Sequence, residues 1–288
     1  MPKITVDLET RSAVNLRDCG AHVYAIDPTT QILCLVFAVD DGEPQLWLPG
    51  DVLRGENTPN SPPAIFSTIA NDPDTWEVGA HQYDFERGIY AAILIPHYGF
   101  PPLPSHIWHC TQRLALSNCY PAELGLLAQA LGLPYRKDPA ARKAMLRVSR
   151  PRANRKRKAG TLPMWNEDPD DLRLTYERCT LDVITARAVR ESPKLKPLCA
   201  TERRYQLQDL AINSRGLLLD RAFATAARDL AIHERIAIHL KLQELTDGTI
   251  TTANQTKRFL EVINAHGHTL TTLNKRAVAQ MPPITIAL

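Results

Sequence analysis

The sequence predicts an α/β fold followed by an all-helical segment. Short apolar runs typical of strands alternate with helically spaced segments in the larger amino-terminal part, whereas only helical spacing follows Pro193 and Pro197. Apolar residues make up 44% of the 288 positions, enough for one or two domains with cores of their own. We therefore expect a mixed α/β domain over residues 1–198 and a helical segment over residues 199–288.

The expected strands are short and come early in the chain. Residues 3–8 form a mostly apolar run that is typical of a buried strand. Residues 31–39 and 45–48 are separated by Asp-Asp-Gly-Glu, a turn sequence that predicts an antiparallel hairpin. Two further short strands are predicted at residues 77–80 and 106–108.

Helical spacing fills most of the remaining chain. The predicted helices of the first domain cover residues 63–71, 85–95, 111–118, 121–131 and a segment from a capping cluster at 168–171 to about 190. Those of the second segment cover residues 199–215, 221–246 and 256–266.

The composition favours a reduced, cytoplasmic protein without a membrane anchor. No apolar run approaches the roughly 18 residues that a transmembrane helix needs. Asp7 and Glu9 lie where a secretory signal would need an apolar core. The six cysteines form no Cys-x-x-Cys pair, a pattern typical of free thiols. The sequence predicts no particular protein partner.

The net charge of +3 conceals a strong asymmetry along the chain. Residues 1–100 carry 14 acidic and 5 basic side chains, whereas residues 136–158 carry 11 basic side chains and one acidic one. The first region could bind cations and the second a polyanion such as nucleic acid. The basic run could also be an ordinary solvated loop.

Four carboxylates are candidates for chemistry. Asp7 and Glu9 are two residues apart on a predicted strand, so both side chains project from the same face. Such a pair repels unless it is protonated or binds cations, and hard divalent ions prefer oxygen ligands. Glu86 follows the strand at 77–80, and Asp182 lies in an apolar stretch of the last helix of the first domain. Taken singly, each could be an ordinary surface acid.

In their order along the chain, these segments resemble the 3′→5′ proofreading exonuclease domain of family A DNA polymerases, particularly the phage-type ones. Residues 4–12 (ITVDLETRS), 80–87 (AHQYDFER) and 178–183 (RCTLDV) resemble the family's three exonuclease motifs. In this register the acid of the second motif is Glu86 and not Asp84.

Residues outside the three motifs extend the resemblance to about residues 3–230. Residues 108–111 match a segment typical of phage-type domains, and residues 212–220 (INSRGLLLD) resemble the entry to the polymerase domain. No palm motif follows them, so we expect a polymerase cut short after its nuclease domain, without polymerase activity.

The resemblance implies a ribonuclease H-like fold and hydrolysis of single-stranded DNA from its 3′ end. It implies that two divalent ions, Mg²⁺ or Mn²⁺, are held by the four carboxylates Asp7, Glu9, Glu86 and Asp182. The residues expected to contact the DNA strand are Thr10, Gln82, Phe85, Arg178 and, in the basic run, Arg155, Lys156, Arg157 and Lys158.

Two positions depart from the family pattern. Gln82 stands where the family has asparagine, and Arg178 stands where it has the tyrosine that orients the attacking water. The histidine subclass places its base one residue earlier, where this chain has Glu177. Arginine cannot act as a base at neutral pH. It can pair with a nearby acid on an exposed helix face, or it can contact a substrate phosphate.

Two other functions stay open at the level of the sequence. One is a nuclease of the same fold that acts on RNA, against which the phage-type segments favour DNA. The other is a catalytically impaired DNA-binding remnant that keeps the fold and the basic run. Arg178 is the feature that favours the remnant.

Overall fold

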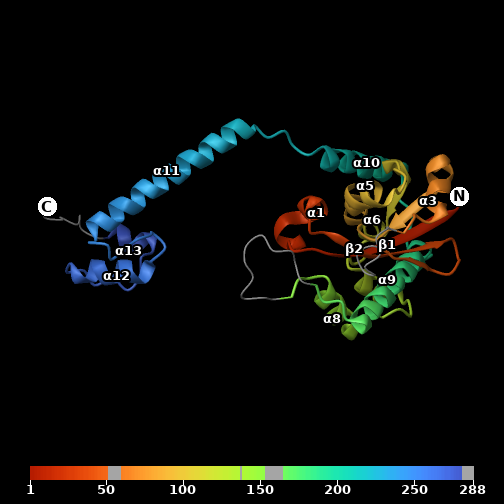
Figure 1. Ribbon diagram of the computed structural model, residues 1–288, viewed down its shortest axis with the longest axis horizontal. Helices are drawn as coiled ribbons and strands as arrows, with labels where there is room; N and C mark the ends of the chain where they lie inside the picture. The colour runs from red at the N-terminus through yellow and green to blue at the C-terminus, as the bar shows by residue number, and fades with distance from the viewer. Residues whose placement is uncertain (51–59, 137, 153–164, 281–288) are drawn as a thin grey trace. The chain divides into compact units, whose positions relative to one another are not determined.

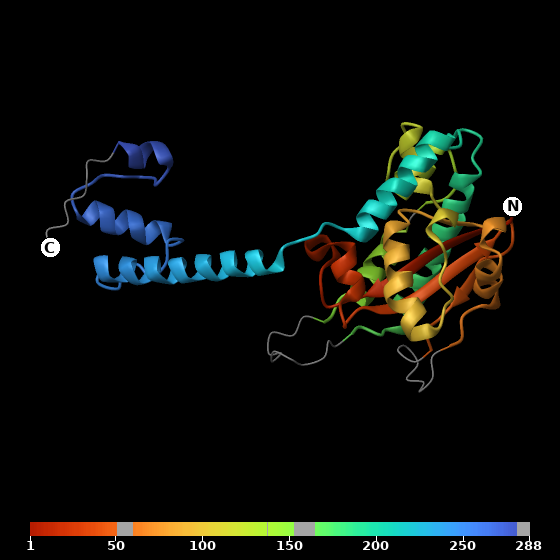
Figure 2. The same ribbon diagram turned by 90° about the horizontal axis from the view of Figure 1, so that it is seen from above.

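The computed structural model describes residues 1–50, 60–136, 138–152 and 165–280. The chain forms two compact units, Met1–Arg215 and Gly216–Leu288. In the part of the chain that is described, the first unit contains a sheet with helices on both faces, and the second unit is helical (Figures 1 and 2).

The sheet is mixed and has five strands within the described residues, in the order β3-β2-β1-β4-β5. The strands are β1 (Lys3–Arg11), β2 (Gln31–Val39), β3 (Gln45–Trp47), β4 (Glu77–Ala80) and β5 (Trp108–Cys110). β1 pairs antiparallel with β2 and parallel with β4, while β3 is antiparallel and β5 parallel to its neighbour. Three antiparallel strands on one side, two parallel strands on the other and helices on both faces confirm the predicted ribonuclease H-like α/β fold class.

β2 is apolar along nearly its whole length because both faces of the sheet are covered. Seven consecutive residues, 32–38, are buried, which is expected for a strand between two helical layers. On one face lies α9 (Pro169–Arg190), which packs on β1 and β2 (Figure 1). The Asp168 side chain accepts hydrogen bonds from the backbone N–H groups of Asp170 and Asp171, so α9 begins where the sequence predicts.

The other face is covered by a core of aromatic side chains. Phe66 makes edge-on contacts with Phe37 and Phe100, at ring-centroid distances of 5.5 and 5.0 Å, and Tyr90 reaches Trp108 at 5.9 Å. The helices of the first unit besides α9 are α1 (Leu16–Ile26), α3 (Ala64–Asn71), α4 (Asp84–Ile89), α5 (Ile95–Tyr98), α6 (Thr111–Ser117), α7 (Leu124–Leu131), α8 (Pro139–Val148) and α10 (Ala200–Arg215).

Several local details differ from the sequence prediction. The helix expected at 85–95 is interrupted by a π-helical turn at Tyr90–Leu94, which separates α4 from α5. The strand expected at 106–108 begins at Trp108 instead, after a 3₁₀ turn. α1 was not predicted; Gly20, with φ of 78°, lies inside it and breaks the helical spacing.

α10 belongs to the first unit, so the boundary between the units lies at Arg215 and not near residue 198 as the sequence suggests. Leu210 is 2% exposed and joins the main core cluster. Asp209 pairs with Arg113 of α6 at 2.7 Å. The prolines at 193 and 197 mark a turn before α10 and do not end the domain.

The second unit contains α11 (Arg221–Leu245), α12 (Thr256–Ala265) and α13 (Lys275–Ala279). α11 begins at Asp220, whose side chain accepts a hydrogen bond from the Phe223 N–H at 2.9 Å. None of the helices in the described ranges combines the length and apolar character that crossing a bilayer requires.

The packing of α10 predicts that Leu210→Ala destabilises the first unit by about 2–5 kcal/mol, the usual cost of a buried Leu→Ala change. All four tryptophans, at 47, 76, 108 and 165, lie in the first unit, so tryptophan fluorescence in urea follows that unit alone. Leu240→Ala in α11, where the side chain is 60% exposed, is the matched control and should leave the transition unchanged. Equal effects of the two changes would contradict the assignment of α10.

Candidate catalytic site

β1 presents Asp7 and Glu9 on one face of the sheet. The neighbouring Val6 and Leu8 are buried, while Asp7 and Glu9 are half-buried, as the period of a strand requires. The pairing with β2 shifts register between Glu9 and Thr10. Such irregularities re-aim side chains and are frequent beside active sites.

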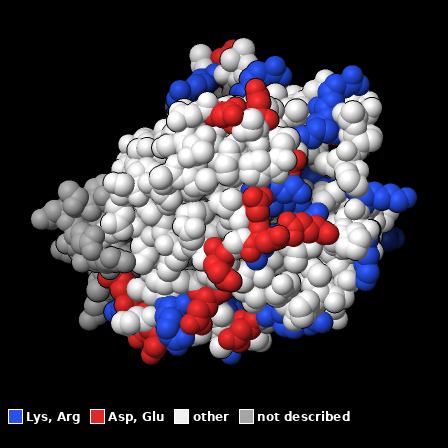
Figure 3. All heavy atoms as spheres, turned by 90° about the vertical axis from the view of Figure 1, so that its right-hand side faces the viewer, with Lys and Arg blue, Asp and Glu red and all other residues white. Residues whose placement is uncertain are grey.

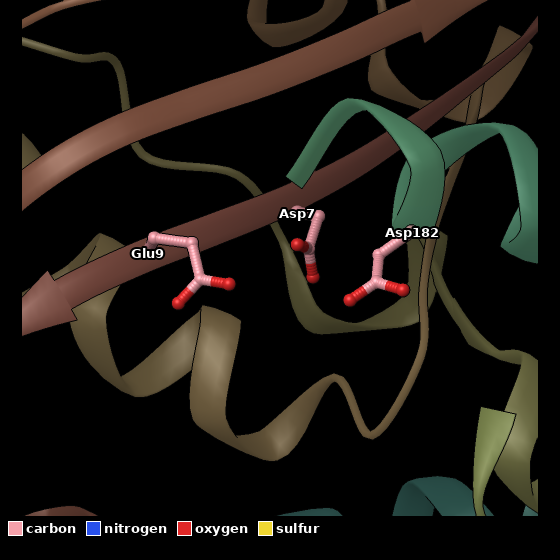
Figure 4. A group of neighbouring side chains, drawn as sticks. All are labelled: Asp7, Glu9 and Asp182. Atoms are coloured by element: carbon pink, nitrogen blue, oxygen red, sulfur yellow. The ribbon is translucent and has the colours of Figure 1, made fainter. Parts of the chain in front are cut away.

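α9 brings Asp182 to the same place from the opposite end of the domain's sequence. Asp182 is 7% exposed, and the carboxylates of Asp7, Glu9 and Asp182 turn toward one another (Figure 4). One oxygen from each lies within 4.8 Å of the others, which makes this a possible metal-holding group among the described residues. The sheet and the helix therefore bring together three of the four predicted acids.

Glu86, the fourth acid, lies on α4 and is 5% exposed. Among the described residues its Oε2 atom has no hydrogen-bond partner. Burial raises the pKa of Glu86 well above its usual value, and the charge of Asp7 raises this pKa further. Glu86 is not one of the described residues whose ligand atoms converge within 4.8 Å. It is nevertheless a buried carboxyl group that interacts with Asp7.

Asp84, two residues earlier, occupies a different environment. Its side chain is 43% exposed and its Oδ2 pairs with Arg113 at 3.0 Å. Asp84 therefore behaves as a surface acid with its own counterion, whereas Glu86 faces the core.

Arg178 lies between two of the acids. Its Nε is 3.4 Å from Glu9 Oε1, and its Nη2 is 3.4 Å from Asp182 Oδ2, one helical turn away. The side chain is only 14% exposed, so the surface position that one interpretation of the sequence allowed does not apply. Arg178 pairs with acids, but it does so inside the candidate site.

Cys179 also contacts this site, and the sequence did not single it out. Its Sγ donates a hydrogen bond to Asp7 Oδ2 at 3.2 Å. Burial raises the pKa of the Cys179 thiol well above its usual value, so the thiol keeps its proton and donates it. The three-residue spacing from Asp182 on one helix was the available signal, but a lone cysteine in a helix is usually a core residue.

Two cavities border the acids. One, of about 350 Å³, is lined by Asp7, Asp182 and Gln82 among others. The second, of about 500 Å³, is lined on one side by Glu9 and Thr10. Its remaining wall combines aromatic, apolar and basic side chains, including Tyr24, Phe85, Met145 and Arg150. These cavities are deep enough to receive part of a ligand next to the carboxylates.

The predicted substrate-contacting residues near the acids have distinct surroundings. Thr10 is buried and its hydroxyl hydrogen-bonds to the Tyr24 hydroxyl at 2.9 Å. The ring of Phe85 lies 5.9 Å from that of Tyr24, so these two aromatic residues form one wall of the larger cavity. Tyr24 was not predicted because it lies in α1, whose spacing is broken by Gly20.

Gln82 has a left-handed backbone conformation, with φ of 63°. Asparagine adopts this region more readily than other residues with a side chain, which gives a physical reason for asparagine in the family pattern. Its carbonyl accepts a hydrogen bond from Phe85 N–H at 3.1 Å, in the turn that starts α4. The departure to glutamine therefore strains the turn by roughly 1 kcal/mol.

Part of the basic run is a helix and not a loop. α8 packs on α9, and Arg147 Nε donates to Asp171 Oδ2 at 2.7 Å. Arg150 lines the cavity beside Glu9. The predicted strand-binding residues Arg155, Lys156, Arg157 and Lys158 lie outside the described residues. On the face shown in Figure 3, acidic and basic side chains are interspersed.

Comparisons with known proteins relate the chain to a phage polymerase. No family model matches the chain. It is 25% identical over 286 residues to a DNA polymerase of Bacillus phage SP02, an alignment that covers 98% of this chain and 41% of that polymerase. The chain thus spans less than half the length of this relative.

A solved structure described as the apo form of the nuclease aligns over 74% of this chain and 76% of that chain. The sequence identity is 15% and the TM-score is 0.32, so this likeness supports no statement about function.

The burial of Glu86 predicts that Glu86→Gln stabilises the protein at pH 7 in the presence of a chelator. An acid whose pKa is raised by folding loses its proton first in the unfolded state, so stability falls as pH rises from about 4.3 through the folded pKa. Glutamine has no proton to lose, so the variant avoids this loss of folding stability, which is on the order of 1 kcal/mol or more. The gain in stability should disappear near pH 4. Urea denaturation of both proteins at several pH values measures it.

Asp84→Asn is the control for this change, because Asp84 is exposed and paired with Arg113. We expect this variant to gain no stability. A larger gain for Asp84→Asn than for Glu86→Gln would mean that the second motif has been placed in the wrong register.

Proposed function

We propose that this chain is a metal-dependent nuclease that removes nucleotides from the 3′ end of single-stranded DNA. The observation that carries the proposal is the meeting of Asp7, Glu9 and Asp182, with the buried Glu86 beside Asp7. The similarity to a phage DNA polymerase over nearly the whole chain supports a role in processing nucleic acid, and DNA is the substrate of such a relative. The order of the three motifs supports the 3′→5′ direction.

The donor set fits hard divalent ions. All four side chains offer carboxylate oxygens, which Mg²⁺ and Mn²⁺ prefer. Glu86 contributes a buried oxygen that no described residue satisfies, so a cation near Asp7 would offset the cost of burying that carboxyl. Two such ions would lower the pKa of a bound water and stabilise the charge that develops on the scissile phosphate.

The protein's own residues then divide the remaining tasks. Cys179 holds one oxygen of Asp7 by its hydrogen bond. Tyr24 and Phe85 offer aromatic surface for the terminal base, and Arg150 offers positive charge to the backbone on the same side. A single strand is favoured over duplex because a terminal base must leave its stack to reach these rings.

Arg178 has a double role in this proposal. Without bound cations, its guanidinium neutralises Glu9 and Asp182. When those carboxylates bind cations, the guanidinium is released and can bind a phosphate with two parallel hydrogen bonds. Arginine replaces the tyrosine of the family without replacing its water-orienting hydroxyl, so we expect slow cleavage.

The second candidate function is a DNA-binding remnant without nuclease activity. Arg178 is the observation that favours it, because an arginine between Glu9 and Asp182 compensates their charge without any metal. The two candidates differ in whether millimolar Mg²⁺ or Mn²⁺ supports shortening of a DNA strand.

The proposal predicts that the purified protein with Mn²⁺ or Mg²⁺ shortens a 5′-labelled single strand to a ladder, faster for DNA than for matched RNA. Asp7→Ala should reduce the rate at least 100-fold, because one of the charges that holds the ions is removed, a loss within the range of about 10²–10⁴ for a single catalytic group. Asp170→Ala, on the same helix as Asp182 but 85% exposed, should cleave normally. Full activity of Asp7→Ala would reject the assignment.

The position of Arg178 predicts that Arg178→Tyr raises the single-turnover cleavage rate about 10-fold or more, within the range of about 10²–10⁴ for a positioned proton-handling group. The change supplies a hydroxyl and frees Glu9 and Asp182, so half-maximal activity should also need less Mn²⁺. Arg173→Tyr, 59% exposed on the same helix, is the control. A tenfold fall would instead show that Arg178 binds the reacting phosphate.

A further inference from the structure

A cavity of about 370 Å³ lies at the far end of the sheet from the acids. Lys3 starts β1 and Glu77 starts β4, and both line this cavity together with Arg190, the last residue of α9. Arg190 is eight residues beyond Asp182, which corresponds to roughly 12 Å along a helix. The cavity is therefore separate from the candidate catalytic site.

Arg190 is the unusual residue of this cavity. Its Nε, Nη1 and Nη2 atoms are all buried, and none has a hydrogen-bond partner among the described residues. Leaving a buried donor unsatisfied lowers stability, and the cost is larger when the donor is charged. Burial accordingly lowers the pKa of Arg190. A buried guanidinium of this kind can donate several hydrogen bonds to a ligand that carries several acceptor oxygens.

The backbone of β4 is shaped around this guanidinium. A Cβ atom added to Gly79 would lie 2.7 Å from Arg190 Nη1, closer than atoms can approach without a shift. Glycine at this position therefore lets the arginine lie against the strand. The arginine therefore lies in a defined position, although no acceptor in the described part of the chain pairs with its donors.

The charges around the cavity are not balanced. Lys3, Arg190 and Arg203 are positive, and Glu77 is the acid that lines it. Burial, and next the charge of Arg203, lower the pKa of His109 to about 4, so His109 is neutral at pH 7. The lining thus carries a net charge of +2, the charge that a phosphate monoester dianion would neutralise.

Arg203 is already committed to protein partners. Its Nη2 donates to the His106 carbonyl at 2.5 Å, and its Nη1 donates to Gln206 at 3.4 Å. The buried donors of Arg190, by contrast, have no partner among the described residues, while Leu198 and its apolar neighbours provide a wall for a less polar group.

We propose that this cavity binds a phosphate monoester the size of a nucleoside 5′-monophosphate, with Arg190 as its principal ligand. The phosphate accepts hydrogen bonds from the Arg190 guanidinium, and Lys3 and Arg203 add positive charge. The volume lies at the lower end of the range for small-molecule sites, roughly 300–1,000 Å³. In the proposed function a mononucleotide is the product of cleavage. This site would therefore bind the product at a place separate from the catalytic carboxylates.

The test is calorimetric titration of the full chain with deoxyadenosine 5′-monophosphate, inorganic phosphate and deoxyadenosine, in a chelator to exclude divalent ions. We expect binding of the monophosphate, weaker binding of inorganic phosphate and none of the nucleoside. Arg190→Gln should weaken monophosphate binding at least 10-fold. Its unfolding midpoint should be unchanged or higher, because the variant loses an unsatisfied buried charge.

Two controls locate the binding. Arg173→Gln removes an exposed arginine from the same helix and should bind as the wild type does. Asp7→Ala should also bind normally, so a failed nuclease assignment would leave this result intact. Equal affinity of Arg190→Gln and wild type, equal binding of the nucleoside, or no binding of the monophosphate at millimolar concentration would each overturn the proposal.

Discussion

The mutual repulsion of clustered carboxylates, two of them buried and two half-buried, is the constraint on which the rest of this structure depends. The central strand β1 fixes the positions of Asp7 and Glu9. Asp182 lies close to them because α9 packs across that strand. Glu86 adds a fourth acid from α4, with its pKa raised by burial and by Asp7. Such a cluster is costly unless positive charge offsets it, and that charge would come from the proposed cations or from Arg178.

Arg178 shows how the same cluster is compensated from within the protein. Its guanidinium pairs with the carboxylates of Glu9 and Asp182. It does so at the position where the exonuclease family that the sequence resembles has a water-orienting tyrosine. One substitution therefore changes both the electrostatics of the acids and the supply of a positioned hydroxyl. The thiol of Cys179 adds a hydrogen bond to Asp7 from the same helix.

α9 carries opposite charges to two separate places, since Asp182 lies near the middle of the helix and Arg190 is its last residue. Asp182 joins the acids, whereas Arg190 enters a cavity with a positive lining, where its guanidinium donors have no partner among the described residues. A phosphodiester cleaved beside the acids yields a phosphate monoester, the kind of anion that suits the other end. One helix thus connects the proposed nuclease site and the proposed phosphate site.

Local sequence determined the strands and the acids of the site. The apolar runs at 31–39 and 77–80 set two strands, and the two-residue spacing of Asp7 and Glu9 set their common face, because these periods belong to the backbone itself. The resemblance added Glu86 and Asp182. Tertiary structure alone decided that Arg178 pairs with Glu9, that Leu210 packs α10 into the first unit and that the Arg190 guanidinium has no acceptor within the described ranges. Those outcomes depend on contacts between residues far apart in the chain, which no local pattern records.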